Sequence, residues 1–216
     1  MLIEKTLLKP NSELRAAARA MLKGNWGKCI LTCFLFGVIA GVAGGIPYAG
    51  IVISLVVTGP LTFGLYKYFL KFKRGENPSL EVLFDGFNYF VTAFVLHLLI
   101  TIFVLLWTLL LIVPGIVAAL RYSMSFYILN DNPNMTAMEA INRSKEMMNG
   151  QKGKLFCLYL SFIGWALLSI LTVGIGFLWL VPYVQTAMVN FYEDLKAAAV
   201  QPAGSPPADT GVSLEQ

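Results

Sequence analysis

CILTCFLFGVIAGVAGGIPYAGIVISLVVTGPLTFGLY, residues 29–66, contains no Asp, Glu, Lys or Arg side chain. Two further stretches without such charges follow, at residues 86–120 and 155–192. A helix needs about 20 apolar residues to cross the hydrocarbon core of a bilayer. Each stretch is too long for one such helix and long enough for two. The sequence therefore predicts an all-α membrane protein with about six transmembrane helices.

Composition supports the same interpretation. Hydrophobic residues make up 57% of the 216 residues, charged residues only 13%, and the mean hydropathy is +0.69. A soluble domain of this size cannot bury so much apolar surface. Residues 1–28 are rich in charge and lack the apolar core of a cleavable signal, so we expect insertion to begin with the first span.

Each long stretch has turn-forming residues near its middle: Gly44 to Pro47, Val113 to Gly115, and Gly174 to Gly176. Glycine permits positive φ and proline interrupts a helix, so these positions predict the reversals of three helical hairpins. The predicted spans are residues 28–45, 49–70, 88–113, 115–130, 155–173 and 177–193.

The orientation follows from the positions of the cations. Fifteen of the sixteen Lys and Arg residues precede span one, follow span two, separate spans four and five, or follow span six; Arg121 is the exception. The positive-inside rule places that side in the cytoplasm. We therefore expect a multi-pass protein of the plasma membrane with both termini cytoplasmic.

Three segments on the predicted cytoplasmic side have the pattern of amphipathic helices: residues 10–23, 77–87 and 136–148. Thr136 followed by Glu139 is a capping-box pattern. Such helices lie in the headgroup plane and are attracted to anionic lipids; the alternative is a solvated loop. The predicted organisation is an amphipathic region at 1–27, a six-span membrane domain at 28–196 and a disordered tail at 197–216, which is rich in Pro, Ala, Gly and Ser.

Several short motifs resemble a known family. They include LKGNWG at 22–27, LFDGF at 83–87, ILNDNP at 128–133, LSFIGW at 160–165 and FYEDL at 191–195. They are similar to family 975 among the domains of unknown function, and the resemblance covers nearly all of the chain except the tail. It implies a bacterial integral membrane protein, distantly similar to the membrane domain beside some glycerophosphodiester phosphodiesterases. The family offers no catalytic residues to carry over.

The residues themselves give little support to catalysis. His97 is the only histidine, and no predicted span contains an acidic side chain apart from Glu193 at the cytoplasmic end of the sixth. A catalytic or metal site needs several convergent groups of these kinds. We expect a protein that is not an enzyme, without metal or cofactor and without a nucleic-acid partner.

Arg121 is the most informative single residue, because a cation within a span costs about 2.5–3.5 kcal/mol on insertion scales. One hypothesis is that Arg121 binds an anionic group such as a lipid phosphate, together with Tyr122, Ser123 and Ser125. The alternative is that its side chain extends towards the outer face of the membrane. The sequence does not decide between these two hypotheses for Arg121.

Gly37 and Gly41 form a GxxxG pattern, which is suited to close helix packing within the chain or in a homo-oligomer. Three functional classes remain. The first is a non-catalytic membrane factor that binds lipid, peptide or a protein partner, with anionic membrane lipids as the expected partners. The second is a small transporter or exporter subunit, and the third a lipid-modifying enzyme that uses cytoplasmic residues such as Asp85, Asp131 or Asp194.

Overall fold

The computed structural model describes residues 8–47 and 50–200, and within these ranges it is helical and contains no strand. The all-α prediction is confirmed. The elements are α1 (Asn11–Leu22), α2 (Trp26–Gly44), α3 (Gly50–Lys73), the 3-10 helix η1 (Leu80–Tyr89), α4 (Phe90–Leu110), α5 (Ile112–Tyr122), α6 (Ser125–Asp131), α7 (Ala137–Met147), α8 (Lys152–Leu171) and α9 (Phe177–Val200).

Five helical segments in the described ranges are long and apolar enough to cross a membrane: Trp26–Gly44, Gly50–Lys73, Leu80–Leu110, Ile112–Asp131 and Lys152–Leu171. Most of them also expose their apolar side chains. Only 11% of the most apolar window of Leu80–Leu110 is buried inside the protein, and Leu109 is 83% exposed. Because so large an apolar surface is unfavourable in water, this arrangement fits a membrane protein.

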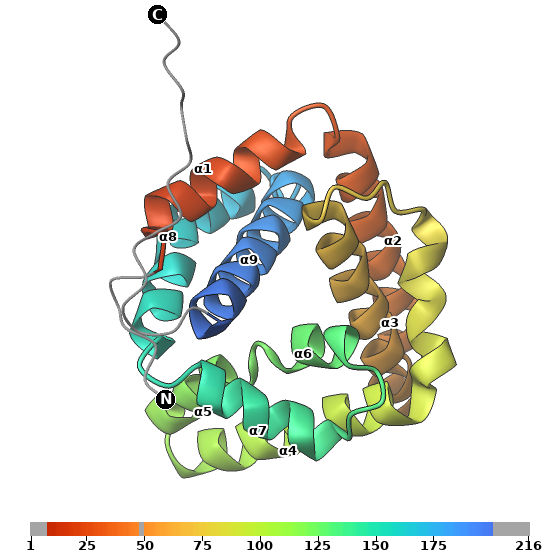
Figure 1. Ribbon diagram of the computed structural model, residues 1–216. Coiled ribbons are helices and arrows are strands. Elements are labelled where there is room, and N and C mark those ends of the chain that lie inside the picture. The colour runs from red at the N-terminus through yellow and green to blue at the C-terminus, as the bar shows by residue number, and fades with distance from the viewer. Residues whose placement is uncertain (1–7, 48–49, 201–216) are drawn as a thin grey trace, which may run out of the picture.

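The last helix, α9, lies at the centre of the molecule. Figure 1 shows α9 crossing the middle, with α1 above it, α8 to its left, α2 and α3 to its right, and α4 to α7 below. It packs against α1, α2, α3 and α8. Ala187, Val189 and Phe191 are fully buried. The hydrophobic core is therefore built around this helix.

The central helix α9 is not among the five apolar segments because of its composition. It carries Pro182, Gln185, Thr186 and Asn190, which lower its hydropathy. Thr186 is fully buried and donates a hydrogen bond to the Pro182 carbonyl at 2.7 Å. The helix continues to Val200, so the predicted disordered tail begins too early; residues 201–216 lie outside the described ranges.

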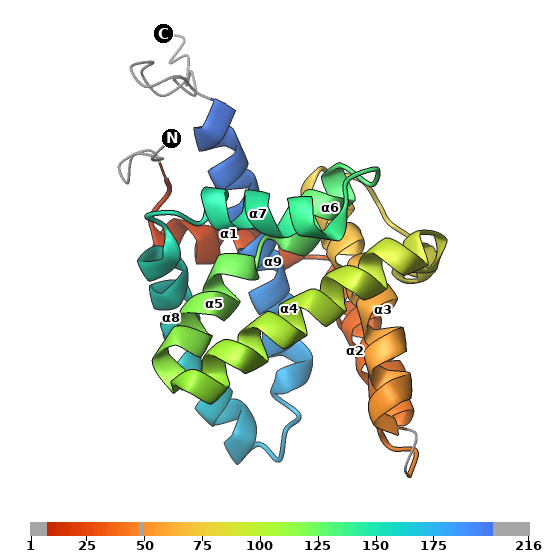
Figure 2. The ribbon, with the colours of Figure 1, turned by 90° about the horizontal axis from the view of Figure 1, so that it is seen from below.

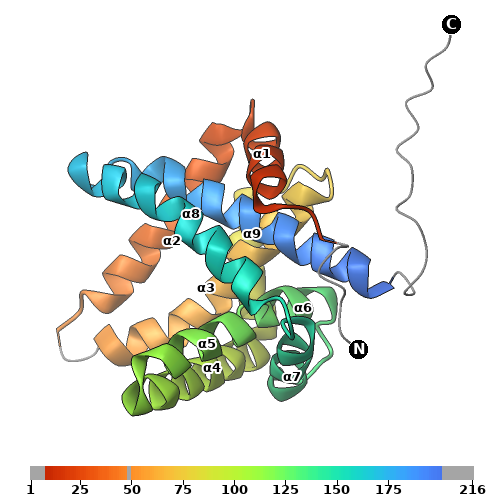
Figure 3. The ribbon, with the colours of Figure 1, turned by 90° about the vertical axis from the view of Figure 1, so that its left-hand side faces the viewer.

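The three chain reversals lie at one end of the molecule, and α1, α6 and α7 lie towards the other, as Figures 2 and 3 show. The second reversal differs from its prediction. Leu111 has an extended backbone between α4 and α5, whereas Pro114 and Gly115 lie in the first turn of α5. A proline is tolerated there because the first N–H groups of a helix have no helical partner.

The predicted span at residues 115–130 falls within the apolar segment Ile112–Asp131, but this segment is not one regular helix. The chain forms α5 and α6, interrupted at Ser123 and Met124. The fully buried Ser144 of α7 bridges this interruption: its hydroxyl donates to the Arg121 carbonyl at 2.7 Å and accepts from the Met124 N–H at 3.2 Å. A residue distant in sequence thus satisfies backbone groups that the interrupted helix leaves unpaired.

Two of the three predicted amphipathic segments form α-helices, α1 and α7, and the third forms η1. The capping box of α7 is confirmed, since the Glu139 N–H donates to Thr136 Oγ1 at 3.3 Å and the Thr136 N–H donates to Glu139 Oε2 at 2.8 Å. At the start of α1, Pro10 occupies the cap position, and no side-chain hydrogen bond caps the helix.

A charged cluster joins three elements near the end of the molecule that carries α6 and α7. Asp131, at the end of α6, accepts from Arg74 at 2.6 Å and from Lys196 at 2.5 Å, and the hydroxyl of Tyr192 donates to it at 2.9 Å. Arg74 also pairs with Glu193 at 2.8 Å. The cluster fixes the C-terminal half of α9 against α6 and the end of α3.

Candidate functional site

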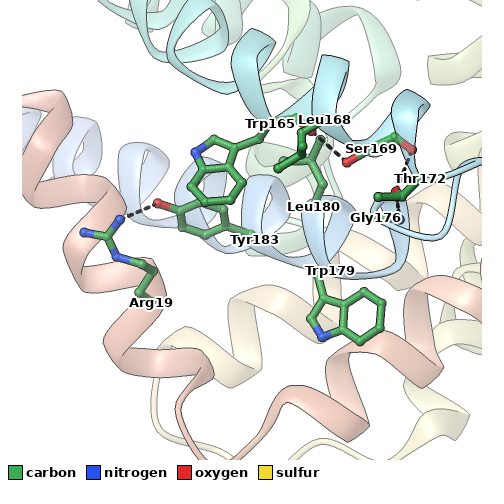
Figure 4. Close-up of a pocket in the computed structure, with 9 residues that line it drawn as sticks. All are labelled: Arg19, Trp165, Leu168, Ser169, Thr172, Gly176, Trp179, Leu180 and Tyr183. Carbon is green, nitrogen blue, oxygen red and sulfur yellow. Dashed lines mark hydrogen bonds between the residues drawn. The ribbon is translucent and has the colours of Figure 1, made fainter.

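A cavity of about 270 Å³ lies between α1, α8 and α9, and Figure 4 shows the side chains around it. Its lining is mostly apolar and aromatic. The lining residues are Arg19 from α1; Trp165, Leu168 and Ser169 from α8; Thr172 and Gly176 from the α8–α9 turn; and Trp179, Leu180 and Tyr183 from α9. Pockets of this kind, apolar with a few placed polar groups, are the usual form of small-molecule sites.

Arg19 reaches this cavity because of the helical spacing of α1. Leu14, Ala18 and Leu22 form the buried stripe of that helix, and Arg19 follows Ala18 at the edge of the stripe. Its Nη1 donates to the hydroxyl of Tyr183 at 3.4 Å. The packing of α1 on α9 therefore places one cation at the cavity (Figure 4).

The wall opposite Arg19 is formed where α8 turns into α9. Gly176 packs so closely against Ser169 that a Cβ atom on residue 176 would overlap its side chain. Ser169 donates to the Trp165 carbonyl at 2.7 Å, and Thr172 donates to the Ser169 carbonyl at 3.0 Å and accepts from the Gly176 N–H at 3.1 Å. The hydroxyl donors at this end are engaged by the protein's own backbone.

Aromatic rings make up much of the remaining wall. Tyr183 is 8% exposed and is held edge-on against Phe162, with ring centroids 5.1 Å apart. Trp165 and Trp179 are 54% and 50% exposed. The cavity is thus bounded by a fixed tyrosine inside and by two tryptophans at the surface.

The charge of Arg19 has no acidic partner, because none of the ion pairs found in residues 8–47 and 50–200 includes it. Its acceptor is the neutral phenol of Tyr183. By contrast, Arg74 is engaged by both Asp131 and Glu193. Arg19 therefore remains free to pair with an anion from outside the protein.

Comparison with known proteins assigns the chain to a family. The family model described as "Protein of unknown function (DUF975)" matches residues 1–120 and 108–199. The chain belongs to the DUF975 family. Neither the curated proteins nor the solved structures contain a match to it.

The residues that the sequence singled out around Arg121 do not form one cluster of free donors in this DUF975 protein. Ser123 donates to its own helix, to the Leu120 carbonyl at 2.8 Å. Tyr122 is buried against Phe103, with ring centroids 6.0 Å apart. Arg121 Nε and Ser125 Oγ are buried without a hydrogen-bond partner. Whether Arg121 binds an anion stays a prediction.

Gly37 and Gly41, the predicted packing pair, lie on an open face of α2. A Cβ atom added at either position would have no other atom within 4 Å. Within the described ranges no other helix packs closely against this pair, and such internal packing was one of the two readings of the pattern. The other reading, contact with a second chain, stays a prediction.

The three acidic residues named for a lipid-modifying enzyme are engaged at separate places in this DUF975 protein. Asp85 pairs with Lys67 at 2.8 Å, and Asp194 accepts from the backbone N–H of Lys9 at 2.8 Å. Asp131 belongs to the charged cluster with Arg74.

Sequence reasoning missed the cavity, although two signals were present. Arg19 lies beside the apolar stripe of an amphipathic helix, and Trp165 and Trp179 flank the third glycine turn. Neither signal indicates which helix α1 packs against. Residues 19 and 183 are brought together only by the tertiary fold.

Proposed function

We propose that this DUF975 protein is a non-catalytic, multi-pass protein of the plasma membrane that holds the hydrocarbon part of an amphiphilic ligand in the cavity between α1, α8 and α9. In this proposal the chain crosses the bilayer six times as three hairpins, with α9 as the central crossing. The reversals face outwards and both termini face the cytoplasm. The distribution of Lys and Arg supports this orientation.

The observation that carries the proposal is the cavity itself: about 270 Å³, apolar and aromatic in lining, with Arg19 as its charged residue. An apolar lining favours hydrocarbon over water, because the transfer of hydrocarbon out of water is favourable. Leu168, which lines the cavity from α8, is 51% exposed, so the cavity opens to the surface of the protein. A lipid chain can therefore enter from the surrounding hydrocarbon without crossing water.

A photoreactive fatty-acyl probe tests this function. The probe is added to the purified protein in mild detergent, cross-linked by light, and mapped by peptide mass spectrometry. We expect labelling to concentrate on α8 and α9 around the cavity. Leu168→Trp should fill the cavity from α8 and reduce that labelling several-fold, whereas Leu167→Trp, on the neighbouring residue outside the lining, should leave it unchanged.

Labelling spread evenly over the exposed apolar faces of α2, α4 and α8 would contradict the proposal, since it would show only general contact with detergent and lipid. Equal labelling of the Leu168→Trp and Leu167→Trp proteins would contradict it too. Circular dichroism of both variants confirms that the helices are retained.

The interruption between α5 and α6 favours a second candidate function, that of a small transporter or exporter subunit. Transporters often use discontinuous helices at their substrate sites. Pro60 within α3 and Pro182 within α9 are further departures from regular helices. Flux of a labelled amphiphile across reconstituted proteoliposomes distinguishes the two functions: a binding factor retains ligand without moving it across the bilayer.

A further inference from the structure

We infer that the ligand of the α1–α8–α9 cavity is a single hydrocarbon chain with an anionic headgroup, bound with the headgroup at Arg19 and the chain directed towards the α8–α9 turn. This inference rests on the proposed function and adds the chemical class and the orientation of the ligand. A phosphate or a carboxylate satisfies the same chemistry.

The charge of the headgroup follows from the surroundings of Arg19. Its guanidinium donates to Tyr183 at 3.4 Å, and none of the ion pairs within residues 8–47 and 50–200 includes it. A guanidinium carries five N–H donors, so one long bond to a phenol leaves most of them available. Phosphate and carboxylate groups match this donor geometry, and charge-assisted bonds are stronger than neutral ones.

The direction of the chain follows from the polarity of the two ends. Arg19 and the Tyr183 hydroxyl lie at one end of the cavity, as Figure 4 shows. At the other end, the hydroxyl groups of Ser169 and Thr172 already donate hydrogen bonds to carbonyls of α8. Side chains such as Leu168 and Leu180 offer apolar contacts at that end. A methylene chain has no hydrogen-bonding groups, so its burial there leaves no polar group unpaired.

The size of the cavity favours one chain. Pockets for drug-sized ligands have volumes of about 300–1,000 Å³, and this cavity of about 270 Å³ lies just below that range. It accommodates part of one hydrocarbon chain rather than the two chains of a phospholipid. The proposed topology places Arg19 towards the cytoplasmic headgroups and the α8–α9 turn towards the outer face. A lipid of the inner leaflet is oriented in the same way, with its headgroup towards the cytoplasm and its chain towards the middle of the bilayer.

The test uses the protein's own tryptophans as reporters. In a Trp26→Phe, Trp107→Phe background, the two remaining tryptophans are Trp165 and Trp179, which both line the cavity. Four probes with the same brominated chain, which quenches indole fluorescence, are titrated into the protein in a neutral detergent. They are a lysophosphatidic acid, a fatty acid, a lysophosphatidylcholine and a monoacylglycerol.

We expect half-maximal quenching by the two anionic probes at concentrations about tenfold lower than by the other two. Arg19→Gln should remove this difference, and Arg19→Lys should keep part of it. Arg15→Gln is the matched control, because Arg15 lies one turn earlier on α1, bonds the Asn11 carbonyl and does not line the cavity. The control should retain the tenfold preference.

Equal quenching by all four probes in the unsubstituted background would overturn this inference and leave the proposed function in place. A tenfold preference that survives Arg19→Gln, or disappears equally in Arg15→Gln, would also overturn it, because the charge would then act from the surface of α1 in general. Absence of quenching by every probe would overturn both this inference and the proposed function. The probe comparison needs no Arg19 variant, so it decides the headgroup charge even if Arg19→Gln does not fold.

Discussion

Gly64 of α3 lies directly against the backbone carbonyl of Leu83 in η1, so closely that a Cβ atom on residue 64 would overlap the carbonyl oxygen. The contact is reciprocal, since a Cβ atom on Gly86 of η1 would overlap the carbonyl oxygen of Pro60 in α3. The two elements thus meet backbone to backbone at two glycines. This contact attaches η1, and with it the start of α4, to α3.

Gly64→Ala and Gly86→Ala should each destabilise the protein, because the added methyl group can be accommodated only by moving one backbone away from the other. Overpacking of this kind costs about 1–3 kcal/mol, and we expect a loss of about 2 kcal/mol in the free energy of unfolding. Titration with SDS in mixed micelles, followed by circular dichroism, measures it.

Gly37→Ala and Gly41→Ala are the matched controls, since nothing lies within 4 Å of the added Cβ atom at either position. We expect changes within about 0.5 kcal/mol for these exposed sites. If all four substitutions had the same effect, the backbone contact between α3 and η1 would not be what stabilises this region.

Asp131→Asn should weaken the attachment of α9, because the Asp131 side chain is 8% exposed and accepts from Arg74, Tyr192 and Lys196. Both cations are about 40% exposed, which reduces the contribution of each pair. We expect a loss of about 2 kcal/mol in the free energy of unfolding. Hydrogen exchange at the C-terminal half of α9 should rise in parallel.

Asp85→Asn is the comparison for Asp131→Asn, since Asp85 pairs only with Lys67 and both side chains are about 30% exposed. Partly exposed single pairs contribute about 0–1 kcal/mol. A loss for Asp85→Asn as large as for Asp131→Asn would show that the charged cluster has no special role.

Ser144→Ala should destabilise the interruption between α5 and α6, because the Arg121 carbonyl and the Met124 N–H would both lose their partner inside the protein. A buried polar group left unpaired costs about 1–3 kcal/mol, and we expect about 2 kcal/mol. Thermal unfolding in detergent measures the change. Ser123→Ala, which removes only a local bond to the Leu120 carbonyl, should cost less than about 0.5 kcal/mol.

The stability of the start of α7 should depend on pH through Glu139. Hydrogen bonds from the Thr136 backbone and hydroxyl hold the pKa of Glu139 below its usual value of about 4.3. Because the pKa is lower in the folded protein, the stabilisation is complete above that usual value and is lost as the pH falls through the lowered pKa. The protection factors of the amides at Ala137 to Ala140, which correct for the slower intrinsic exchange in acid, should therefore fall as the pH is lowered, and Glu139→Gln should abolish this dependence.

Local rules predicted much of the helical framework. The charge-free stretches coincide with helices, and Thr136 and Glu139 start α7 as their spacing predicts. These features depend on neighbours within a few residues, so sequence is sufficient for them. The positions of Gly64 and Gly86 show the limit. A GxxxG motif pointed to Gly37 and Gly41, whereas the close backbone contacts are made by glycines without that spacing.

The sequence by itself determined that the chain is helical and that five of its helical segments are apolar enough for a membrane. Only the tertiary structure decided that α9 is central, that residues 115–130 divide into α5 and α6, and that Arg19 meets Tyr183 at a cavity. The physical reason is that lipid chains and packed side chains are both apolar. Hydropathy therefore cannot distinguish a helix that faces lipid from one that faces other helices, and the packing of the side chains makes that choice.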